Sequence, residues 1–513
     1  MNKRKTFRFF GLLVVLFLIA NLFMPANASP DYGVPHLQPA LAELASSDPS
    51  QVVQVIVQKV GGTTDAEQAV VRLGGKVTQD LHIIKAFAAE MTARAAKELA
   101  RAESVRWVSL DAEMAPTGCT ACIDTKNLVN AYVRAIRADK VWNNAPYIQG
   151  QGVGVAVIDS GINPSGDLYT SMGANRQVAN VRFNTDYNQN SSDGYGHGTH
   201  VASIVGGDGS DSNGQYIGVA PMANIINVKV SNDDGSAMMK DIVLGLQWVL
   251  DNKDTYNIRV VNLSLNSTVA ESYHTSPLDA AVEILWFNKI VVVTSAGNQG
   301  NGALYPPAND PFVITVGAVD DKSTAILTDD VVPSFSAYGM TVDGFAKPDL
   351  VAPGKNITAR LVNSNMGVAK DHPANKVGTQ YFRMSGTSMS APMVSGAVAL
   401  LLQDEPDLNP DQVKYRLMAT ANKSWTGYNA TKAGAGYLDI YAAVNGSTTA
   451  SANIDILVSQ LLTTGTEPIT WGSVGWNSVG WNTVGWNTVG WNTVGWNTVG
   501  WNTVGWNSDY WGQ

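Results

Sequence analysis

Short apolar, β-branched runs alternate with helical segments through the middle of the chain, and this alternation limits the possible folds more than any other feature. Continuous apolar strands separated by helices indicate a parallel sheet with helices on both faces. The predicted strands are residues 153–159, 225–230, 258–265, 290–295 and 312–319, and the predicted helices are 238–250 and 277–288. The fold class is therefore α/β, and functional groups are expected at the carboxyl ends of the strands.

Three polar motifs stand at the ends of these predicted elements. Asp159 ends the first strand, His197 lies between two glycines before an apolar helix, and Ser388 precedes a long run of small apolar residues. A serine at a loop-to-helix junction lies near unpaired N–H groups, which suits a nucleophile whose attack creates an oxyanion. The alternative is that Ser388 only caps the helix. Together the three residues form the set needed for base-assisted acyl transfer.

The order Asp, His, Ser and the surrounding motifs extend over most of the chain. From about residue 141 to about residue 444, the sequence resembles the subtilisin family of serine proteases. The resemblance implies a subtilisin-like parallel sheet and a triad in which Ser388 is the nucleophile, His197 the base and then the acid, and Asp159 the group that orients the histidine. His200, the second histidine of the His-Gly-Thr-His motif, is expected to be structural.

Further site residues are implied by the same resemblance. Asn298 follows the strand 290–295 and matches the asparagine that donates to the oxyanion, although an asparagine after glycine is also an ordinary turn former. The run 260–266 resembles the strand to which an extended peptide substrate adds by main-chain hydrogen bonds. The expected substrate-binding residues are Ser264, Leu265, Asn266, Ala296 and Gly297. Many relatives have glycine at the position of Asn266, so its side chain is expected to narrow the rim of the pocket.

No cofactor is required for this chemistry. Relatives often bind structural calcium through loop carboxylates and carbonyls, so the resemblance implies that calcium binding is possible. The acidic residues in loop-like contexts are Asp208, Asp211, Asp233, Asp234, Asp320 and Asp321. Their spacing does not match an EF-hand, and solvated surface carboxylates are the alternative, so no metal ligand is assigned.

Residues 1–28 have the pattern of a secretory signal peptide. A basic start is followed by an apolar run over 9–23 and an Ala-Asn-Ala cleavage site at 26–28. The apolar run is short for a membrane span, although an uncleaved anchor, and with it a membrane-held protease, is the alternative. The formal net charge is -9 and the leader is basic, which argues against nucleic acid as the main partner. We therefore expect a secreted, extracellular protein.

Residues 29–115 are predicted to form a small separate domain. After a loose lead-in over 29–50, strand and helix patterns follow in the order β-α-β-β-α-β, which is typical of a ferredoxin-like fold. Such a domain between a signal and a protease body resembles the inhibitory propeptide of the family. Cleavage between Asp111 and Thr125 would release the enzyme, and a permanent accessory domain is the alternative.

The connecting segments are also informative. Residues 116–140 are predicted to be a linker and lead-in, with an amphipathic helix over 128–142, and 141–445 are predicted to be the catalytic domain. Cys119 and Cys122 are the only cysteines, and they are consistent with a small disulfide or with half of a metal site. A helix over 410–421 is predicted to be capped by Asn409, and 446–470 to be a second linker.

The final segment, 471–513, is a repeat. Tryptophan recurs every five residues from Trp471 to Trp506, mostly as Trp-Asn-Thr-Val-Gly, and no charged residue appears before Asp509. A period of five fits neither one face of a helix nor one face of a strand, whereas repeated glycine turns would give a solenoid-like array. Three interpretations remain open: stacking on sugars of the cell envelope, packing on the catalytic body, or a low-complexity tail.

The sequence predicts a secreted serine endopeptidase that is autoprocessed from a proenzyme. Its partners would be protein or peptide substrates and its own propeptide as inhibitor, with no nucleic acid and with cell-envelope contact through the tail. The rival interpretation is a surface-binding protein in which the protease body is secondary.

Overall fold

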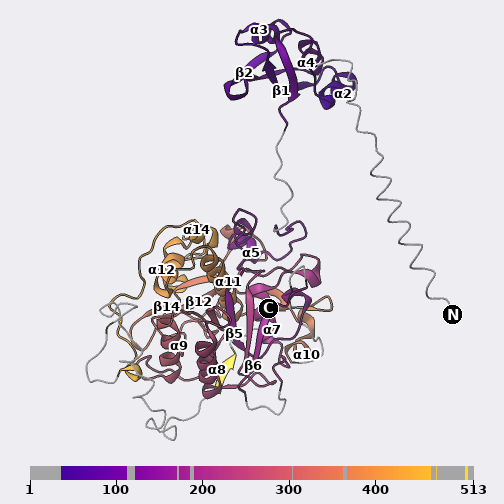
Figure 1. Cartoon of the computed structure of the whole chain (residues 1–513). Coiled ribbons are helices and arrows are strands. Elements are labelled where there is room, and N and C mark those ends of the chain that lie inside the picture. Colours follow the sequence, from indigo (N-terminus) through magenta and orange to yellow (C-terminus); the bar gives the residue numbers. More distant parts are fainter. Residues whose placement is uncertain are drawn as a thin grey trace, which may run out of the picture. The chain divides into compact units, whose positions relative to one another are not determined.

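The computed structural model describes residues 36–112, 122–169, 173–184, 190–302, 304–361, 367–463, 470 and 503–506. The chain divides into two compact units, Met1–Cys119 and Thr120–Gln513 (Figure 1). The predicted signal peptide and most of the predicted repeat tail lie outside the described residues. Within the described residues, no helix has the length and apolar character needed to cross a membrane.

The N-terminal unit contains a four-stranded antiparallel sheet in the order β2-β3-β1-β4. Its elements are α2 (Pro39–Ser47), β1 (Val52–Lys59), α3 (Asp65–Arg72), β2 (Lys76–Leu81), β3 (Ala86–Thr92), α4 (Ala93–Leu99) and β4 (Val105–Leu110). From β1 onward this is the predicted β-α-β-β-α-β order. Thr92 caps α4, since its hydroxyl accepts from the Ala95 N–H.

Helix α2 corrects the prediction of a loose lead-in over 29–50. Pro39 occupies the first helical position, where its missing N–H costs nothing, and Leu41 and Ala45 are buried on one side of the helix. The helix packs against α4. Tertiary burial therefore stabilises a segment whose composition alone does not predict a helix.

The second unit is organised around a seven-stranded sheet in the order β15-β12-β11-β9-β5-β7-β6, in which all the neighbouring strands are parallel. Its strands are β5 (Gly154–Asp159), β6 (Gln177–Arg182), β7 (Asn224–Lys229), β9 (Ile258–Leu263), β11 (Val291–Ser295), β12 (Ile314–Val319) and β15 (Leu350–Pro353). The five central strands are the predicted ones. The two edge strands were missed because β6 mixes polar and apolar residues and β15 is short and ends at a proline.

Helices cover both faces of this sheet. Helix α7 (His197–Gly206) packs against α11 (Thr387–Asp404), and α8 (Met239–Asn252) packs against α9 (Pro277–Phe287). Gly198 of α7 lies against Asp159, whereas Gly245 of α8 lies against Ile158. Adjacent residues of a strand point to opposite faces, so α7 and α8 lie on opposite sides of β5.

The segment that leads into the sheet differs from the prediction of one helix over 128–142. It forms two short helices, α5 (Tyr132–Ala135) and α6 (Asp139–Trp142). Arg137 between them has a φ of 62°, a left-handed conformation that a continuous α-helix does not contain. One side of the segment is still apolar, and Val133 and Trp142 are fully buried.

Smaller elements complete the second unit. They are β13 (Gly339–Met340), β14 (Ala346–Lys347), β16 (Ile357–Arg360), α10 (Val368–Asp371), β17 (Lys376–Val377), β18 (Tyr381–Met384), α12 (Pro410–Thr420), α13 (Ala430–Ala433) and α14 (Ile440–Val444). Helix α12 begins as predicted, because Asn409 and Gln412 form a reciprocal capping box.

A separate three-stranded sheet contains the one described strand of the repeat tail. The order is β10 (Leu265–Ser267), β19 (Thr503–Trp506) and β8 (Ala237–Met238), with β19 in the middle. Figure 1 shows β19 as the yellow arrow beside α8. The repeat therefore contributes a strand to the second unit.

Candidate active site

Asp159 and His197 form a hydrogen-bonded pair at the carboxyl end of β5. The His197 Nδ1 atom lies 2.9 Å from Asp159 Oδ1 and 3.0 Å from Oδ2, and both side chains are almost fully buried. Asp159 Oδ1 also accepts from the Ser160 N–H at 2.7 Å. Because the carboxylate holds Nδ1, the Nε2 atom is the ring nitrogen that points away from Asp159.

Two glycines allow His197 to approach β5 this closely. Gly196 has a φ of 102° at the start of α7, in the region that favours glycine. A Cβ atom at Gly198 would lie 2.2 Å from the Gly161 carbonyl oxygen and 2.9 Å from Asp159 Oδ1. The Gly-His-Gly motif is therefore required by the close packing of the first turn of α7 on the end of β5.

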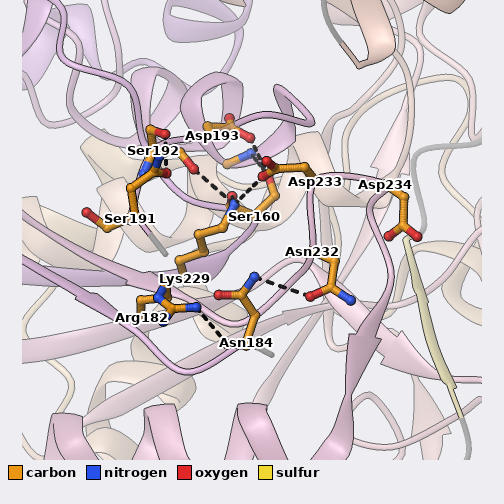
Figure 2. Close-up of polar contacts among 12 residues, drawn as sticks. Ser160, Arg182, Asn184, Ser191, Ser192, Asp193, Lys229, Asn232, Asp233 and Asp234 are labelled. Carbon is orange, nitrogen blue, oxygen red and sulfur yellow. Dashed lines mark hydrogen bonds and ion pairs between the residues drawn. The ribbon is translucent and has the colours of Figure 1, made fainter. Parts of the chain in front are cut away.

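A second buried carboxylate, Asp193, holds this turn in place (Figure 2). Its Oδ1 accepts from the Ser160 hydroxyl at 2.8 Å and from the Gly196 N–H at 2.6 Å. Its Oδ2 accepts from the Thr199 N–H at 2.8 Å and the Thr199 hydroxyl at 2.6 Å. Burial raises the pKa of Asp193, and these hydrogen bonds oppose that shift. Sequence reasoning missed Asp193, and its place four residues before His197 was the only signal.

Lys229 is a fully buried cation beside the same pair. It ends β7, where it stands directly opposite Asp159 in the strand register. Its Nζ donates to the Ser160 carbonyl at 2.6 Å, the Ser192 carbonyl at 2.9 Å and Asp233 Oδ1 at 2.8 Å. Figure 2 shows these partners converging on the amine. Sequence reasoning missed it too, although a lysine inside a predicted buried strand was a usable signal.

Ser388 lies in the first turn of α11 and is fully buried. Its hydroxyl donates to the Ser264 carbonyl at 3.0 Å, and the Ser264 hydroxyl donates to the Ser388 carbonyl at 3.0 Å. Pro392, four residues along the helix, has no N–H to give to that carbonyl. The Ser264 hydroxyl takes the place of the missing helical donor, which ties the end of β9 to the start of α11.

Asn298 follows β11 and contacts the residue before Ser388. Its Oδ1 accepts from the Thr387 N–H at 3.0 Å and from the Thr387 hydroxyl at 3.1 Å. A backbone N–H can only donate, so this contact fixes which end of the amide is the oxygen. Among the described residues, the buried Nδ2 atom has no hydrogen-bond partner. A buried donor without a partner is costly, which marks this N–H group as one that a ligand would satisfy.

These groups meet at one edge of the sheet. Asp159, Ser264 and Asn298 all end or follow parallel strands, whose carboxyl ends share an edge. The start of α11 is bonded to Ser264 and Asn298, and α11 packs against α7, which begins at His197. The structure thus joins Asp159 to His197, and Ser388 to Ser264 next to the Asn298–Thr387 contact, whereas the approach of His197 to Ser388 stays a prediction.

His200 has a different environment from His197. Its Nε2 lies 3.2 Å from the Ile357 carbonyl oxygen and 3.0 Å from that of Phe382, two residues of the paired strands β16 and β18. Burial, reinforced by His197, lowers the pKa of His200 to about 3. A neutral histidine that bonds to two carbonyl groups fits the structural role expected from the sequence.

The predicted substrate-binding residues surround the start of α11. The Asn266 amide donates to the Ser295 carbonyl at 3.0 Å and is buried, and Gly297 N–H donates to the Thr387 hydroxyl at 3.0 Å. Ala296 is buried in a small apolar cluster with Leu304. Leu265 and Asn266 belong to β10. The Asn266 side chain is thus turned toward the end of β11, and its place on a pocket rim stays a prediction.

The acidic loop residues considered for calcium have protein partners instead. Asp211 pairs with Arg360 at 2.8 Å, Asp233 with Lys229 at 2.8 Å, and Asp320 with Lys322 at 2.7 Å. In the part of the chain that the structure describes, no group of three or more histidine, cysteine or carboxylate side chains could hold a metal ion. Calcium binding therefore stays a prediction without assigned ligands. Cys122 is disulfide-bonded, which favours the disulfide over the metal-ligand alternative, and Cys119 lies outside the described residues.

Comparisons with known proteins agree with this geometry. The family model described as "Subtilase family" matches residues 150–437. Serine protease AprX of Bacillus subtilis (strain 168) is 40% identical over 331 residues, which cover 63% of this chain and 73% of that protein. Subtilisin DY of Bacillus licheniformis is 34% identical over 290 residues, covering 56% of this chain and 89% of that protein. The structure of the CspB protease of Clostridium perfringens covers 61% of this chain and 98% of its own, with a TM-score of 0.50 and 19% identity, and supports the fold alone.

Proposed function

Because the chain belongs to the subtilase family and is a serine endopeptidase, we propose that it hydrolyses peptide bonds through Ser388, His197 and Asp159. The contact that carries this proposal is the buried pair between Asp159 and His197 Nδ1. A carboxylate on Nδ1 keeps that nitrogen protonated and leaves Nε2 as the base. The predicted subtilisin-like parallel sheet is confirmed by the structure and the family match.

The chemistry then follows from the placement of each group. The Ser388 oxygen attacks the substrate carbonyl while His197 Nε2 takes its proton, and the Asp159 carboxylate stabilises the imidazolium. His197 returns the proton to the leaving amine, which breaks the peptide bond and leaves an acyl group on Ser388. Water, activated by the same histidine, then releases the acid. No redox or nucleotide cofactor is needed.

Asn298 is proposed to stabilise the oxyanion. Its buried Nδ2 group lacks a partner among the described residues, and Thr387 holds the other end of the amide. A donor that is oriented before the reaction stabilises negative charge as it develops and needs no reorganisation at that moment. This supports the role that the resemblance implied.

The substrates are proteins or peptides, as expected of an endopeptidase of this family. We propose that an extended substrate adds to the edge of β10, so that Ser264, Leu265 and Asn266 contact its backbone. Ala296 and Gly297 would line the pocket for the residue before the cut. Main-chain recognition of this kind tolerates many sequences.

The N-terminal unit is proposed to be an inhibitory propeptide. Support comes from its ferredoxin-like element order and from a buried core that belongs to the unit itself. Cleavage between Asp111 and Thr125 would release the mature enzyme, and the signal sequence at 1–28 would direct secretion. N-terminal sequencing of the secreted product would test both steps, and retention of residue 1 would contradict them.

The decisive test is Ser388→Ala in the full chain. We expect loss of peptide hydrolysis and of any cleavage between Asp111 and Thr125. Ser390→Ala is the matched control, because Ser390 is in the same helical turn and donates to the carbonyls of Ala352 and Pro353. That variant should lose about 1 kcal/mol of stability and keep its activity. Normal hydrolysis by Ser388→Ala would overturn the mechanism.

Contact of the repeat tail with the cell envelope is a separate proposal that its many tryptophans support. Aromatic rings stack on flat apolar faces, including those of sugars. Deletion of residues 471–513 should then abolish cosedimentation with envelope material while proteolysis is kept. Equal cosedimentation of both forms would contradict it.

A further inference from the structure

The strand β19 lies between two strands that are far from it in sequence. It is antiparallel to β10, with Trp506 opposite Leu265, Gly505 opposite Asn266 and Val504 opposite Ser267. It is also antiparallel to β8, with Thr503 opposite Met238 and Val504 opposite Ala237. Four residues of the repeat tail therefore fill the space between β8 and β10 and give both strands a partner.

This space adjoins the proposed nucleophile. Leu265, the partner of Trp506, directly follows Ser264, whose carbonyl accepts from the Ser388 hydroxyl. On the other side, β8 follows the turn that contains Asp233, the partner of Lys229. In Figure 2 the pale yellow strand runs beside this turn, near Asp234. The tail strand thus pairs with the edge of β10 that the proposed function assigns to substrate.

We propose that the repeat tail is an internal ligand of the peptide channel between β8 and β10 and competes there with substrate. The ligand is an uncharged, extended Ser/Thr-Val-Gly-Trp segment supplied by the same chain. The inference rests on the proposed function in one respect, because it takes the edge of β10 to be the place where substrate binds.

The chemistry of the tail suits this role. A strand with partners on both sides forms main-chain hydrogen bonds along both edges, so its binding does not depend on a particular side chain. The tail has no charged residue between Trp471 and Ser508, so no charge has to be desolvated when a segment enters. Strand addition therefore accounts for the contact without any special pocket.

The repetition makes the tail an effective competitor. The Ser/Thr-Val-Gly-Trp segment occurs seven times, beginning at 473, 478, 483, 488, 493, 498 and 503. Each copy can present the same backbone to β8 and β10, and tethering supplies an effective concentration on the order of millimolar. We expect deletion of 503–513 alone to leave the other copies able to bind, so KM should stay within twofold of the full chain.

Removal of the whole tail is the first test. We compare the chain with and without residues 471–513, using steady-state hydrolysis of a short chromogenic peptide. Competition predicts a KM at least threefold lower without the tail and an unchanged kcat, because the substrate no longer has to displace a strand. Equal KM values would overturn the inference.

A binding measurement keeps the two proposals distinguishable. Hydrogen exchange at the amides of β8 and β10 is compared in Ser388→Ala chains with and without residues 471–513, so that no catalysis is involved. We expect slower exchange when the tail is present, since β19 covers both strands. Slower exchange with the tail present would support the inference whatever the activity of the parent chain, and equal exchange would reject it. Absence of peptide hydrolysis by the parent chain, with Ser388 intact, would reject the proposed function alone.

Proline substitutions separate strand pairing from the mere presence of a tail. Val504→Pro and the same change in the other six copies place proline inside the paired segment, where it cannot donate to a neighbouring strand. Asn502→Pro and its equivalents place the same number of prolines just outside that segment. The variant with prolines inside the paired segment should have the KM of the chain that lacks residues 471–513. The variant with prolines outside that segment should have the KM of the full chain. Identical behaviour of the two variants would overturn the inference.

Discussion

The Asn298 amide has its oxygen held by Thr387 and its buried Nδ2 group without a partner among the described residues. We predict that Asn298→Ala lowers kcat by about 10²–10³ and changes KM little, a figure taken from the equivalent substitution in subtilisin itself. Steady-state kinetics on a peptide substrate would check this. Asn453→Ala is the control, because that buried amide bonds to Phe312 and Asp411 instead. A kcat within threefold of the parent would contradict the oxyanion role.

A buried acidic cluster, Asp279, Glu283 and Asp310, makes stability depend on pH. Burial raises the pKa of each carboxyl group, and their mutual repulsion raises those of Asp279 and Glu283 further. Burial raises the pKa of Asp310 to about 7, even though Lys347 and Lys414 lower it. In the unfolded chain an aspartate has a pKa of about 3.9. The stabilisation that protonated Asp310 gives to the folded state is therefore complete below about pH 4, and it is lost as the pH rises through 7.

Asp310→Asn tests this linkage, since an amide resembles the protonated acid and its oxygen can still accept from the Phe312 N–H. In a Ser388→Ala background, which prevents autolysis, we expect the variant to gain unfolding free energy relative to the parent between pH 4 and pH 8. Urea unfolding at several pH values measures the difference. Asp254→Asn, at an exposed position, should show a much smaller trend. A constant difference for Asp310→Asn would refute the pKa assignment.

At the level of single residues, the sequence predicted groups that carry local signals. Asp159, His197 and Ser388 each stand in a short motif of glycines and small residues that their backbone geometry requires, as Gly196 and Gly198 show. Asp193 and Lys229 have no such motif. Their importance comes from contacts between segments, which only the folded chain brings together.

At the level of elements, the buried Lys229 joins β7 to the end of β5 and to the turn before β8. Lys229→Met keeps the volume of the side chain and removes three hydrogen bonds. We expect a loss of about 3 kcal/mol of stability, as for other broken buried ion pairs, and a lower kcat because the Ser160 carbonyl next to Asp159 loses its donor. Lys253→Met, at a more exposed pair, should cost under about 0.5 kcal/mol. Unchanged stability and kcat in Lys229→Met would exclude this role.

The central elements were predictable because their patterns are strong. Strands β5, β7, β9, β11 and β12 are almost wholly buried, and apolar residues outnumber polar ones in each of them except β7. Helix α2 and the edge strands β6 and β15 escaped prediction because tertiary contacts decide their structure. The prediction of one continuous helix over 128–142 was wrong, because Arg137 adopts a left-handed conformation that the periodicity of the sequence does not reveal.

At the level of the whole molecule, composition and motif order indicated separate parts, and the structure gives each unit its own buried core. The pairing of β19 with β8 and β10 was beyond sequence reasoning, because seven equivalent copies give no reason to choose one partner. The sequence left packing on the catalytic body open as one of three interpretations. The described strand favours that interpretation for residues 503–506.

The last prediction joins the two proposed inhibitors. If the N-terminal unit and the repeat tail both bind in the peptide channel, only one of them can be bound at a time. By mass action, the presence of one then weakens the apparent binding of the other. We therefore expect separately produced residues 29–115 to inhibit the mature enzyme with a Ki at least threefold higher when the tail is present. Inhibition titrations with a peptide substrate measure this ratio. The Asn502→Pro series should keep this ratio of Ki values, and the Val504→Pro series should bring it to one. Equal Ki values for the full and tail-deleted enzymes would show that the two ligands do not share a site.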